Sequence, residues 1–351
     1  MSEKDISLFD LSLPAMQALF LDMGEPAFRA KQLYRQLYVN LAGAFDEMTD
    51  LSAALRERLS AKLPFGTLEI KQVLSGDRNL TRKALFHVPG GPPVESVLMI
   101  YKDRATVCVS TQSGCAMGCT FCATAQLGFR LNLGAGQMIE QVLWAARTLK
   151  REERPPLTNV VYMGMGEPFN NYNNWWESVE RLHDPKGFNM GARSFTVSTV
   201  GIVPGILRLS EEDLPVNLAV SLHAPDDNLR SQLVPINTKY PIADIMNAVR
   251  TYTDKTHRRV SFEYVLLEQV NDHPDHAGAL ARLLRKTLSH VNLIPWNPVP
   301  GTPLAPSIRE RVEAFQSVLE KQGIACTIRT QRGVDIAAAC GQLAGGAEGR
   351  C

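Results

Sequence analysis

The sequence predicts an α/β protein in which a helical region and a few antiparallel strands precede a parallel sheet. Three observations support this prediction. Up to residue 65, apolar residues recur at helical spacing. Residues 66–103 hold short strand-like runs separated by turn residues such as Gly-Asp and Gly-Gly-Pro. From residue 104 onward, strand and helix patterns alternate, which is typical of an open parallel sheet or of a full or partial barrel.

The first 65 residues are expected to form three helices. These cover residues 12–20, 26–37 and 51–63, with capping or proline residues at their boundaries. Three basic side chains lie away from the apolar stripe of the second helix: Arg29, Lys31 and Arg35. They could contact phosphates. A solvated helix face is the simpler interpretation of the same three residues.

The following segment is expected to form an antiparallel meander. Strands are predicted over residues 68–74, 81–88 and 94–101, and a fourth over residues 105–111. Glu95 lies in the third strand among apolar residues. A carboxylate in such surroundings can act as a base with a raised pKa. An exposed position on the polar side of the strand is the commoner outcome.

The remainder alternates regularly between strands and helices. Strands are expected at residues 159–163, 194–199, 216–222, 260–267, 291–296 and 325–330. Helices are expected at residues 137–149, 172–182, 242–253, 275–288 and 308–322. We therefore divide the chain into a helical domain (1–65), a β extension (66–103), an α/β domain (104–331) and a C-terminal loop (332–351).

Three cysteines follow the first strand of the α/β domain at a spacing that indicates a metal site. Cys115, Cys119 and Cys122 form a C-x3-C-x2-C array. Clustered thiolates bind zinc and iron–sulfur clusters. A structural zinc site normally has four protein ligands. Because no fourth Cys or His lies close by in the sequence, the array predicts a reactive metal site with one open coordination position.

Small and polar residues also mark the ends of other strands. The second parallel strand ends in Gly-Met-Gly-Glu, where Gly166 lets a ligand approach the backbone and Glu167 could hold an ammonium group. Four further polar side chains follow later strands: Ser198, Ser221, His223 and Asn297. Each alone would be a cap or a turn former. Since parallel strands end at one edge, together they predict a polar pocket beside the cysteines.

Composition and the last cysteines add to this interpretation. The 351 residues carry a net charge of +1, so any nucleic-acid surface must be a local patch. The start of the chain lacks the pattern of a signal peptide, and no apolar run approaches the roughly 20 residues of a membrane helix. Seven cysteines, three of them clustered, favour a reducing, cytoplasmic setting. Cys340 stands among small residues beyond the last strand, as an accessible nucleophilic thiol would.

The chain resembles the radical S-adenosylmethionine superfamily in its C-x3-C-x2-C array, its GMGEP segment and its α/β alternation. Within that superfamily it resembles the RNA adenine methyltransferases of the RlmN/Cfr group. The segments that carry this second resemblance are GCAMGCTFCATAQLGF, SLHAPDD, HVNLIPWNPVPGTP and ACGQLAG. The IPWNPVPGTP and TAQLGF segments look more like the branch that methylates adenine C2 than the branch that methylates C8.

The resemblance implies a fold and a set of cofactor ligands. The expected fold is a partial (β/α)6 barrel with an N-terminal helical accessory domain and a short antiparallel extension. Cys115, Cys119 and Cys122 would hold a [4Fe–4S] cluster, whose open iron would be chelated by S-adenosylmethionine. The cofactor pocket would be lined by Gly166, Glu167, Ser198, Ser221, Leu222, His223 and Asn297.

The resemblance also implies a covalent mechanism. Cys340 would accept a methyl group from one S-adenosylmethionine, and a radical derived from a second would take hydrogen from that methyl. The resulting carbon radical would add to adenine C2, and Glu95 would remove the C2 proton. Cys108 would then attack the sulfur of Cys340 and release the product through a transient disulfide, as thiol–disulfide exchange allows.

The implied partners are RNA and a source of electrons. The family's C2 enzymes act on an adenosine of 23S ribosomal RNA and on the adenosine 3′ of the anticodon in some transfer RNAs. A flavodoxin and its reductase would be a suitable electron donor, and no membrane is involved. The target base would have to leave its stack. Two alternatives stay open, namely methylation of C8 and a non-catalytic RNA-binding protein that uses its cysteines to hold a metal.

Overall fold

A ten-stranded mixed sheet is the framework of the molecule, for which a computed structural model describes residues 6–346. The strand order is β1-β2-β3-β4-β7-β8-β9-β10-β11-β12. The first four strands pair antiparallel: β1 (Glu69–Gly76), β2 (Thr81–Val88), β3 (Gly91–Ile100) and β4 (Ala105–Cys108). From β4 onward every pairing is parallel: β7 (Asn159–Tyr162), β8 (Phe195–Thr199), β9 (Asn217–Ser221), β10 (Val260–Leu266), β11 (Ser289–Pro295) and β12 (Cys326–Ile328).

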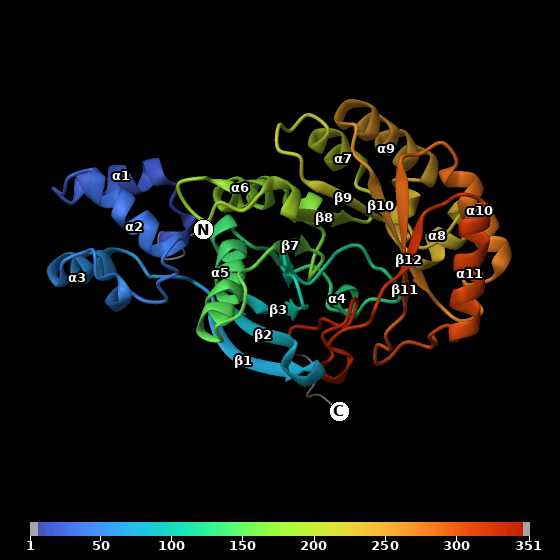
Figure 1. Ribbon diagram of the computed structural model, residues 1–351, viewed down its shortest axis with the longest axis horizontal. Coiled ribbons are helices and arrows are strands. Elements are labelled where there is room, and N and C mark those ends of the chain that lie inside the picture. Colours follow the sequence, from blue (N-terminus) through green and yellow to red (C-terminus); the bar gives the residue numbers. More distant parts are fainter. Residues whose placement is uncertain (1–5, 347–351) are drawn as a thin grey trace.

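Helices connect successive parallel strands and cover the outer side of the curved sheet (Figure 1). They are α5 (Ala135–Arg151), α6 (Tyr172–His183), α7 (Val203–Leu209), α9 (Ile242–Thr256), α10 (Pro274–Leu284) and α11 (Arg309–Lys321), with the short α8 (Asp227–Leu233) placed before α9. Six βα units thus precede the final strand β12. Since β1 and β12 remain the two edges of the sheet, the barrel is partial. This confirms the predicted fold class.

The interior follows from the apolar strand sequences. Parallel strands that are covered on both faces need apolar side chains on both, and Val107, Val160, Val197, Val220 and Val291 are each fully buried. On α5 most of the buried side chains from Met138 to Leu149 are apolar, while Lys150 near its end is exposed. The sheet and its helices therefore enclose one continuous core.

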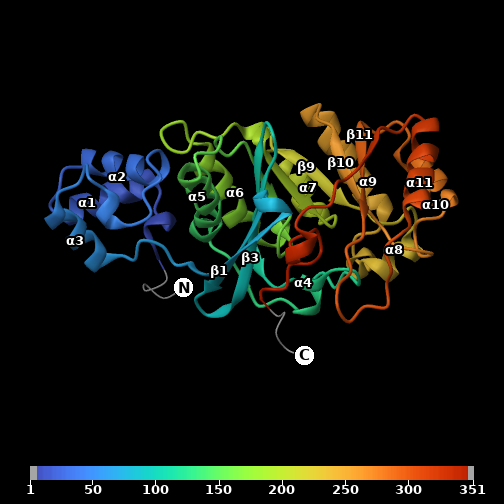
Figure 2. The ribbon, with the colours of Figure 1, turned by 60° about the horizontal axis from the view of Figure 1, so that its bottom comes forward.

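The N-terminal helices form a compact group at one end of the molecule, beside α5 and α6 (Figure 2). They are α1 (Leu13–Asp22), α2 (Phe28–Tyr38) and α3 (Ala53–Lys62). Ser12 and Ser52 cap α1 and α3 by accepting hydrogen bonds from the backbone N–H groups three residues later. Arg147 of α5 donates to the carbonyls of Leu41 and Ala42 at 3.1 and 2.7 Å, which fastens this group to the barrel.

Several elements differ from the sequence prediction. The helices α7, α8 and α4 (Ala123–Gln126) were absent from it, as was the small β5–β6 pair (Gln112–Ser113 with Leu131–Asn132). These elements have seven residues or fewer, too few to display a helical or strand period. The strand predicted to run to residue 111 ends at Cys108, because residues 109–111 bond instead to the β7 strand and the turn after it.

No helix within residues 6–346 has the length and apolar character that crossing a membrane would need.

Candidate active site

The three clustered cysteines lie on one loop between β5 and α4, at the carboxyl edge of the parallel strands. The N–H of Cys115 donates to Gly128 O at 3.1 Å, and the N–H of Cys122 donates to Cys119 O at 3.3 Å. Gly114 has a φ of +71°, and a Cβ there would come within 1.8 Å of Gly128 O. Only glycine fits this position. The backbone thus holds the three cysteines in one compact loop.

The thiols of this loop are strongly desolvated. Burial raises the pKa of Cys115 to about 12 and raises the pKa of Cys119 and of Cys122 as well. The charges of Cys122 and Cys115 add to the shift at Cys119, so the three sulfurs are electrostatic neighbours. Three buried thiolates repel one another, and bound cations would relieve that repulsion. The loop is therefore suited to a metal that is held by thiolates.

The donor set fits an iron–sulfur cluster. Across residues 6–346, no three His, Cys, Asp or Glu side chains are arranged around a point where one metal ion could sit. The cysteines of an iron–sulfur cluster bind different iron atoms, so their sulfurs surround a larger centre. Three thiol ligands with no fourth protein ligand suit such a cluster with one iron left open.

A buried arginine, Arg230 of α8, lies next to this loop and was not anticipated. It is fully buried and donates to Leu222 O at 3.1 Å, to Ser221 O at 3.2 Å and to Asn237 Oδ1 at 2.8 Å. Burial lowers its pKa to about 10, and the charge of Cys119 opposes that shift. Arg230 therefore ties the end of β9 together and places a positive charge beside the thiolates. Its polar sequence neighbours carried no sign that it would be buried.

Gly166 and Glu167 follow β7 and contact residues of β5 and of the turn after β8. Gly166 has a φ of +102°, and a Cβ there would lie 2.6 Å from the side chain of Gln112. Glu167 is buried, and its carboxylate accepts from the N–H of Phe169 at 3.0 Å and of Val200 at 2.8 Å. Burial raises its pKa to about 7. A cationic ligand at this carboxylate would restore its ionised form.

The remaining predicted pocket residues also lie at this edge. The hydroxyls of Ser198 and Ser221 are 3.2 Å apart. The Nδ1 atom of His223 accepts from the N–H of Val265 at 3.1 Å, and the ring meets Phe121 edge-on at 4.7 Å between centroids. Burial, followed by the charge of Arg230, lowers the pKa of His223 to about 3. His223 is therefore neutral, and its proton is on Nε2.

Leu222 and Asn297 differ in what they can offer a ligand. Leu222 is fully buried, and both its backbone groups are already paired, with Glu263 and Arg230. The Nδ2 group of Asn297 donates to Cys340 O at 3.4 Å. The Oδ1 atom of Asn297 is buried and finds no hydrogen-bond partner within residues 6–346. Such an atom needs a donor, which the amino or hydroxyl groups of S-adenosylmethionine could supply.

The C-terminal segment brings Cys340 to the cysteine loop. The N–H of Ala123, directly after Cys122, donates to Gly341 O at 2.8 Å, and Thr124 Oγ1 donates to Leu343 O at 2.7 Å. Figure 1 shows this segment, in red, beside α4. Cys340 is exposed to solvent, yet the surrounding chain desolvates its thiol and, together with Glu263, raises its pKa. A thiol twelve residues beyond β12 thus lies beside the predicted cluster site.

Cys108 lies at the end of β4 and close to Cys340. Burial raises its pKa to about 12, and the charge of Cys340 contributes to the shift. Both are free thiols, and no disulfide joins any pair of cysteines in the described part of the chain. The disulfide expected between Cys108 and Cys340 is therefore not supported by the structure. A reduced Cys340 is the form that can act as a nucleophile.

Glu95 does not face water, which corrects the simpler interpretation of its strand position. Its side chain is 4% exposed, and its Oε1 atom is 2.9 Å from Lys83 Nζ. Its Oε2 atom accepts from the N–H groups of Ala344 and Gly345 at 2.7 and 3.1 Å. The C-terminal segment therefore brings Glu95 into the same site as Cys340. Lys83 was not anticipated, because an alternating strand pattern does not reveal which side chains a distant loop will cover.

The basic residues of α2 lie elsewhere. Lys31 and Arg35 are exposed one helical turn apart, and Arg29 is half-buried against Phe28 and bonded to Gln32 at 2.9 Å. The structure leaves the helix face available but brings none of the three to the cysteine loop.

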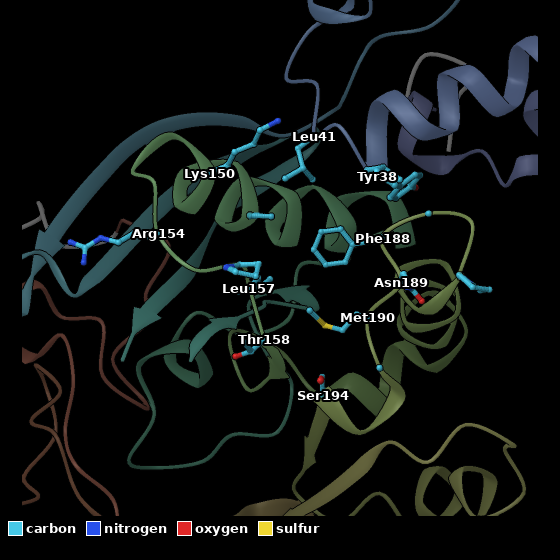
Figure 3. Close-up of a pocket in the computed structure, with 16 residues that line it drawn as sticks. Tyr38, Leu41, Lys150, Arg154, Leu157, Thr158, Phe188, Asn189, Met190 and Ser194 are labelled. Atoms are coloured by element: carbon cyan, nitrogen blue, oxygen red, sulfur yellow. The ribbon is translucent and has the colours of Figure 1, made fainter. Parts of the chain in front are cut away.

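A cavity of about 810 Å³ opens between α2, α5 and the segment after α6 (Figure 3). Leu157, Phe188 and Met190 line it, and Lys150 and Arg154 stand at its rim. Its lining includes Thr158 and Ser194, which directly precede β7 and β8. The cavity therefore lies at the amino edge of the sheet, opposite the cysteine loop, and is separate from the candidate site.

Comparison with known proteins agrees with this geometry. The model of a family described as the ribosomal RNA large subunit methyltransferase N-terminal domain matches residues 6–63, and that of the radical SAM superfamily matches residues 109–280. A "probable dual-specificity RNA methyltransferase RlmN" from Chloroflexus aurantiacus is 62% identical over 348 residues, covering 96% of this chain and 92% of its own. The protein of the same description from Roseiflexus castenholzii is 55% identical, covering 97% and 96%.

A solved structure agrees as well. The crystal structure of a radical SAM methyltransferase from Sphaerobacter thermophilus superposes with a TM-score of 0.95 at 49% identity, covering 97% of this chain and 99% of the other. The likeness extends over the helical region, the antiparallel strands and the parallel sheet. The chain belongs to the RlmN family of dual-specificity RNA methyltransferases, within the radical SAM superfamily.

Proposed function

We propose that this protein methylates C2 of an adenosine in 23S ribosomal RNA and in transfer RNA, by way of a methyl group carried on Cys340. The observation that carries the proposal is the hydrogen bond between Ala123 N–H and Gly341 O, which brings a free thiol beside the cysteine loop. A protein that used its clustered cysteines only to hold a structural metal would have no need for the additional thiol of Cys340 beside them.

Membership in the radical SAM superfamily implies a [4Fe–4S] cluster and S-adenosylmethionine. When bound, these groups supply the methyl group and the radical chemistry that an unreactive aromatic C–H bond requires, with two S-adenosylmethionine molecules used in each turnover. In our proposal, Cys115, Cys119 and Cys122 hold the cluster. S-adenosylmethionine is held by Gly166, Glu167, Ser198, Ser221, Leu222, His223 and Asn297.

The chain's own groups then have distinct roles. Cys340, as the thiolate, takes the methyl group, and its sulfur later links the protein to adenine C2 through one carbon. Glu95 accepts the proton that leaves C2. Cys108 attacks the Cys340 sulfur, so that a disulfide forms, the S–C bond breaks and the bonding pair leaves with the carbon, which becomes the product methyl once protonated. External thiols return both cysteines to the reduced state.

The helical region is suited to holding the RNA. Lys31 and Arg35 expose two cations on one face of α2, beside the exposed ring of Phe28. Cations with an adjacent aromatic ring suit a nucleic-acid backbone and its bases. We assign the RNA contact to this region and the chemistry to the α/β domain, in line with the division at residues 65, 103 and 331. A flavodoxin and its reductase would supply electrons, and the cytoplasm would supply reducing conditions.

The decisive experiment is mass spectrometry of ribosomal and transfer RNA from a methylation-deficient host that expresses this chain. We expect a methyl group on adenine C2 with the wild-type protein and none with the Cys340→Ala variant. Cys326→Ala is the matched control, because Cys326 is a half-buried thiol of β12 outside the site. Methylation at C8 alone, or full methylation by Cys340→Ala, would contradict the proposal.

A further inference from the structure

A buried ion pair of the β extension holds the segment that carries Cys340. We call residues 333–346 the Cys340 loop. Lys83 Nζ donates to Ala337 O at 3.1 Å, on the amino side of Cys340. Glu95 Oε2 accepts from Ala344 and Gly345 N–H groups at 2.7 and 3.1 Å, on the carboxyl side. The two side chains meet at 2.9 Å and are 5% and 4% exposed.

We propose that Lys83 and Glu95 form a clasp that docks the Cys340 loop, and that opening this clasp releases the loop and the Glu95 carboxylate together. Lys83 is then a positioning residue for the reaction. The inference deepens the proposed function and rests on it for the role of Cys340.

The placement of the pair suits this role. Lys83 lies on β2 and Glu95 on the neighbouring antiparallel strand β3, where Glu95 is opposite Leu85 and Lys83 is opposite Val97. The two residues are thus diagonal neighbours on one face. Burying an ion pair carries a desolvation cost, and apolar residues of similar size often stabilise a fold as well or better. What a polar pair offers here is a donor and an acceptor that match backbone groups on both sides of Cys340.

In the docked arrangement, the Cys340 loop covers the Oε2 atom of Glu95. Its carboxylate already receives three donors: Lys83 Nζ and the N–H groups of Ala344 and Gly345. When the loop leaves, two of the three donors leave with it and Oε2 is uncovered. Undocking therefore uncovers the atom that, in the proposed function, receives the C2 proton.

A second anchor can keep the start of the loop in place while the clasp opens. Asp77 Oδ2 accepts from the N–H of Gly333 at 2.8 Å, and the N–H of Asp77 donates to Asp335 Oδ2 at 3.1 Å. These bonds hold the first residues of the loop and involve neither Lys83 nor Glu95. The start of the loop can therefore stay in place when the clasp opens, and release of residues 337–345 also breaks the bonds to Ala123 and Thr124.

The test compares Lys83→Met with Lys71→Met in the cluster-loaded protein without S-adenosylmethionine. Lys71 is a matched control, because it pairs with Glu69 at 2.7 Å on the exposed β1 strand of the same sheet. Two readouts are resolved by mass spectrometry, namely hydrogen exchange of peptides from residues 333–346 and the rate at which iodoacetamide alkylates Cys340. We expect Lys83→Met to raise the exchange rate and the alkylation rate roughly tenfold, because it removes one charge-assisted hydrogen bond. Lys71→Met should match the wild type.

A double variant separates release of the loop from general unfolding. Lys83→Met with Glu95→Gln leaves no unpaired buried charge, so its melting temperature should exceed that of Lys83→Met. Its loop should still exchange faster than in the wild type, because a neutral acceptor holds the two N–H groups less strongly and the bond to Ala337 is gone. Exchange at the wild-type rate in either Lys83 variant would overturn the clasp. Neither readout needs RNA methylation, so the clasp and the proposed function can fail separately.

Discussion

Cys340 and Cys108 are the residues on which the proposed chemistry depends most. Neither belongs to the cysteine array, and they are 232 positions apart by their residue numbers. The fold makes them electrostatic neighbours, since the charge of one shifts the pKa of the other. Burial keeps the pKa of both above the ordinary value, so each is a thiol at neutral pH and must lose its proton when it reacts.

Replacing Cys108 should trap the protein on its substrate. Without the resolving thiol, the carbon that links Cys340 to adenine C2 has no leaving route, so Cys108→Ala should accumulate a covalent protein–RNA species. Denaturing gel electrophoresis of the purified variant, with and without ribonuclease, would reveal it as a band that nuclease removes. Cys326→Ala should give no such band. A Cys108→Ala preparation free of RNA that still methylates would rule out the assigned role.

At the level of elements, Glu140 of α5 couples the helical region to the barrel. Its carboxylate accepts from the N–H of Thr67 at 3.0 Å and from the N–H of Leu68 at 3.1 Å, in the segment that leads to β1. Burial raises its pKa to about 7. Between its ordinary pKa of 4.5 and the folded-state pKa of about 7, the Glu140 carboxyl is therefore protonated in the folded protein and ionised in the unfolded chain.

Stability should consequently fall as the pH rises from about 4.5 to about 7, by up to about 3 kcal/mol from this group. The contribution is fully present below the lower pKa and is lost above the upper one. Glu140→Gln cannot titrate and should lack this part of the pH dependence. Denaturant unfolding of both proteins at pH 4.5, 6 and 8 would measure it. A constant difference in the free energy of unfolding across those pH values would refute it.

The exposed basic residues of α2 lead to a separate prediction about RNA binding. If Lys31 and Arg35 contact phosphates, the Lys31→Ala/Arg35→Ala variant should bind RNA more weakly and with a shallower salt dependence, its slope falling by about 1 to 2. A filter-binding titration across salt concentrations would measure this. Lys62→Ala/Lys71→Ala is the control of equal charge, because both lysines already pair with carboxylates. Equal slopes for the two variants would remove α2 from the RNA interface.

On the scale of the whole molecule, periodicity predicted the long elements and local motifs predicted the cofactor edge. The long helices α5, α6, α9 and α11 were found within two or three residues of their predicted bounds, because each is long enough to display its apolar stripe. The strand ends bearing Glu167, Ser198, Ser221 and His223 followed from the rule that parallel strands end at one edge.

What the sequence left undetermined depends on contacts between distant segments. Arg230 belongs to a short polar helix, and only the packed fold shows that it is buried beside Cys119. Lys83 lies in β2 and Glu95 in β3, where polar residues would ordinarily face water. They are buried because a loop some 250 positions later covers them. Periodicity describes the neighbours of a residue along the chain and carries no information about such partners.

The reach of the Cys340 loop has a consequence for how the protein is made. The loop bonds to Asp77, Lys83 and Glu95 across sequence separations of 258, 254 and 249. Contacts between such distant segments form slowly, and on the ribosome they must wait until the Cys340 loop itself has emerged. A nascent or truncated chain can therefore assemble most of its barrel while Glu95 remains uncovered and Cys340 undocked. Synthesis of the Cys340 loop is in this way the last requirement for docking Cys340 beside Glu95.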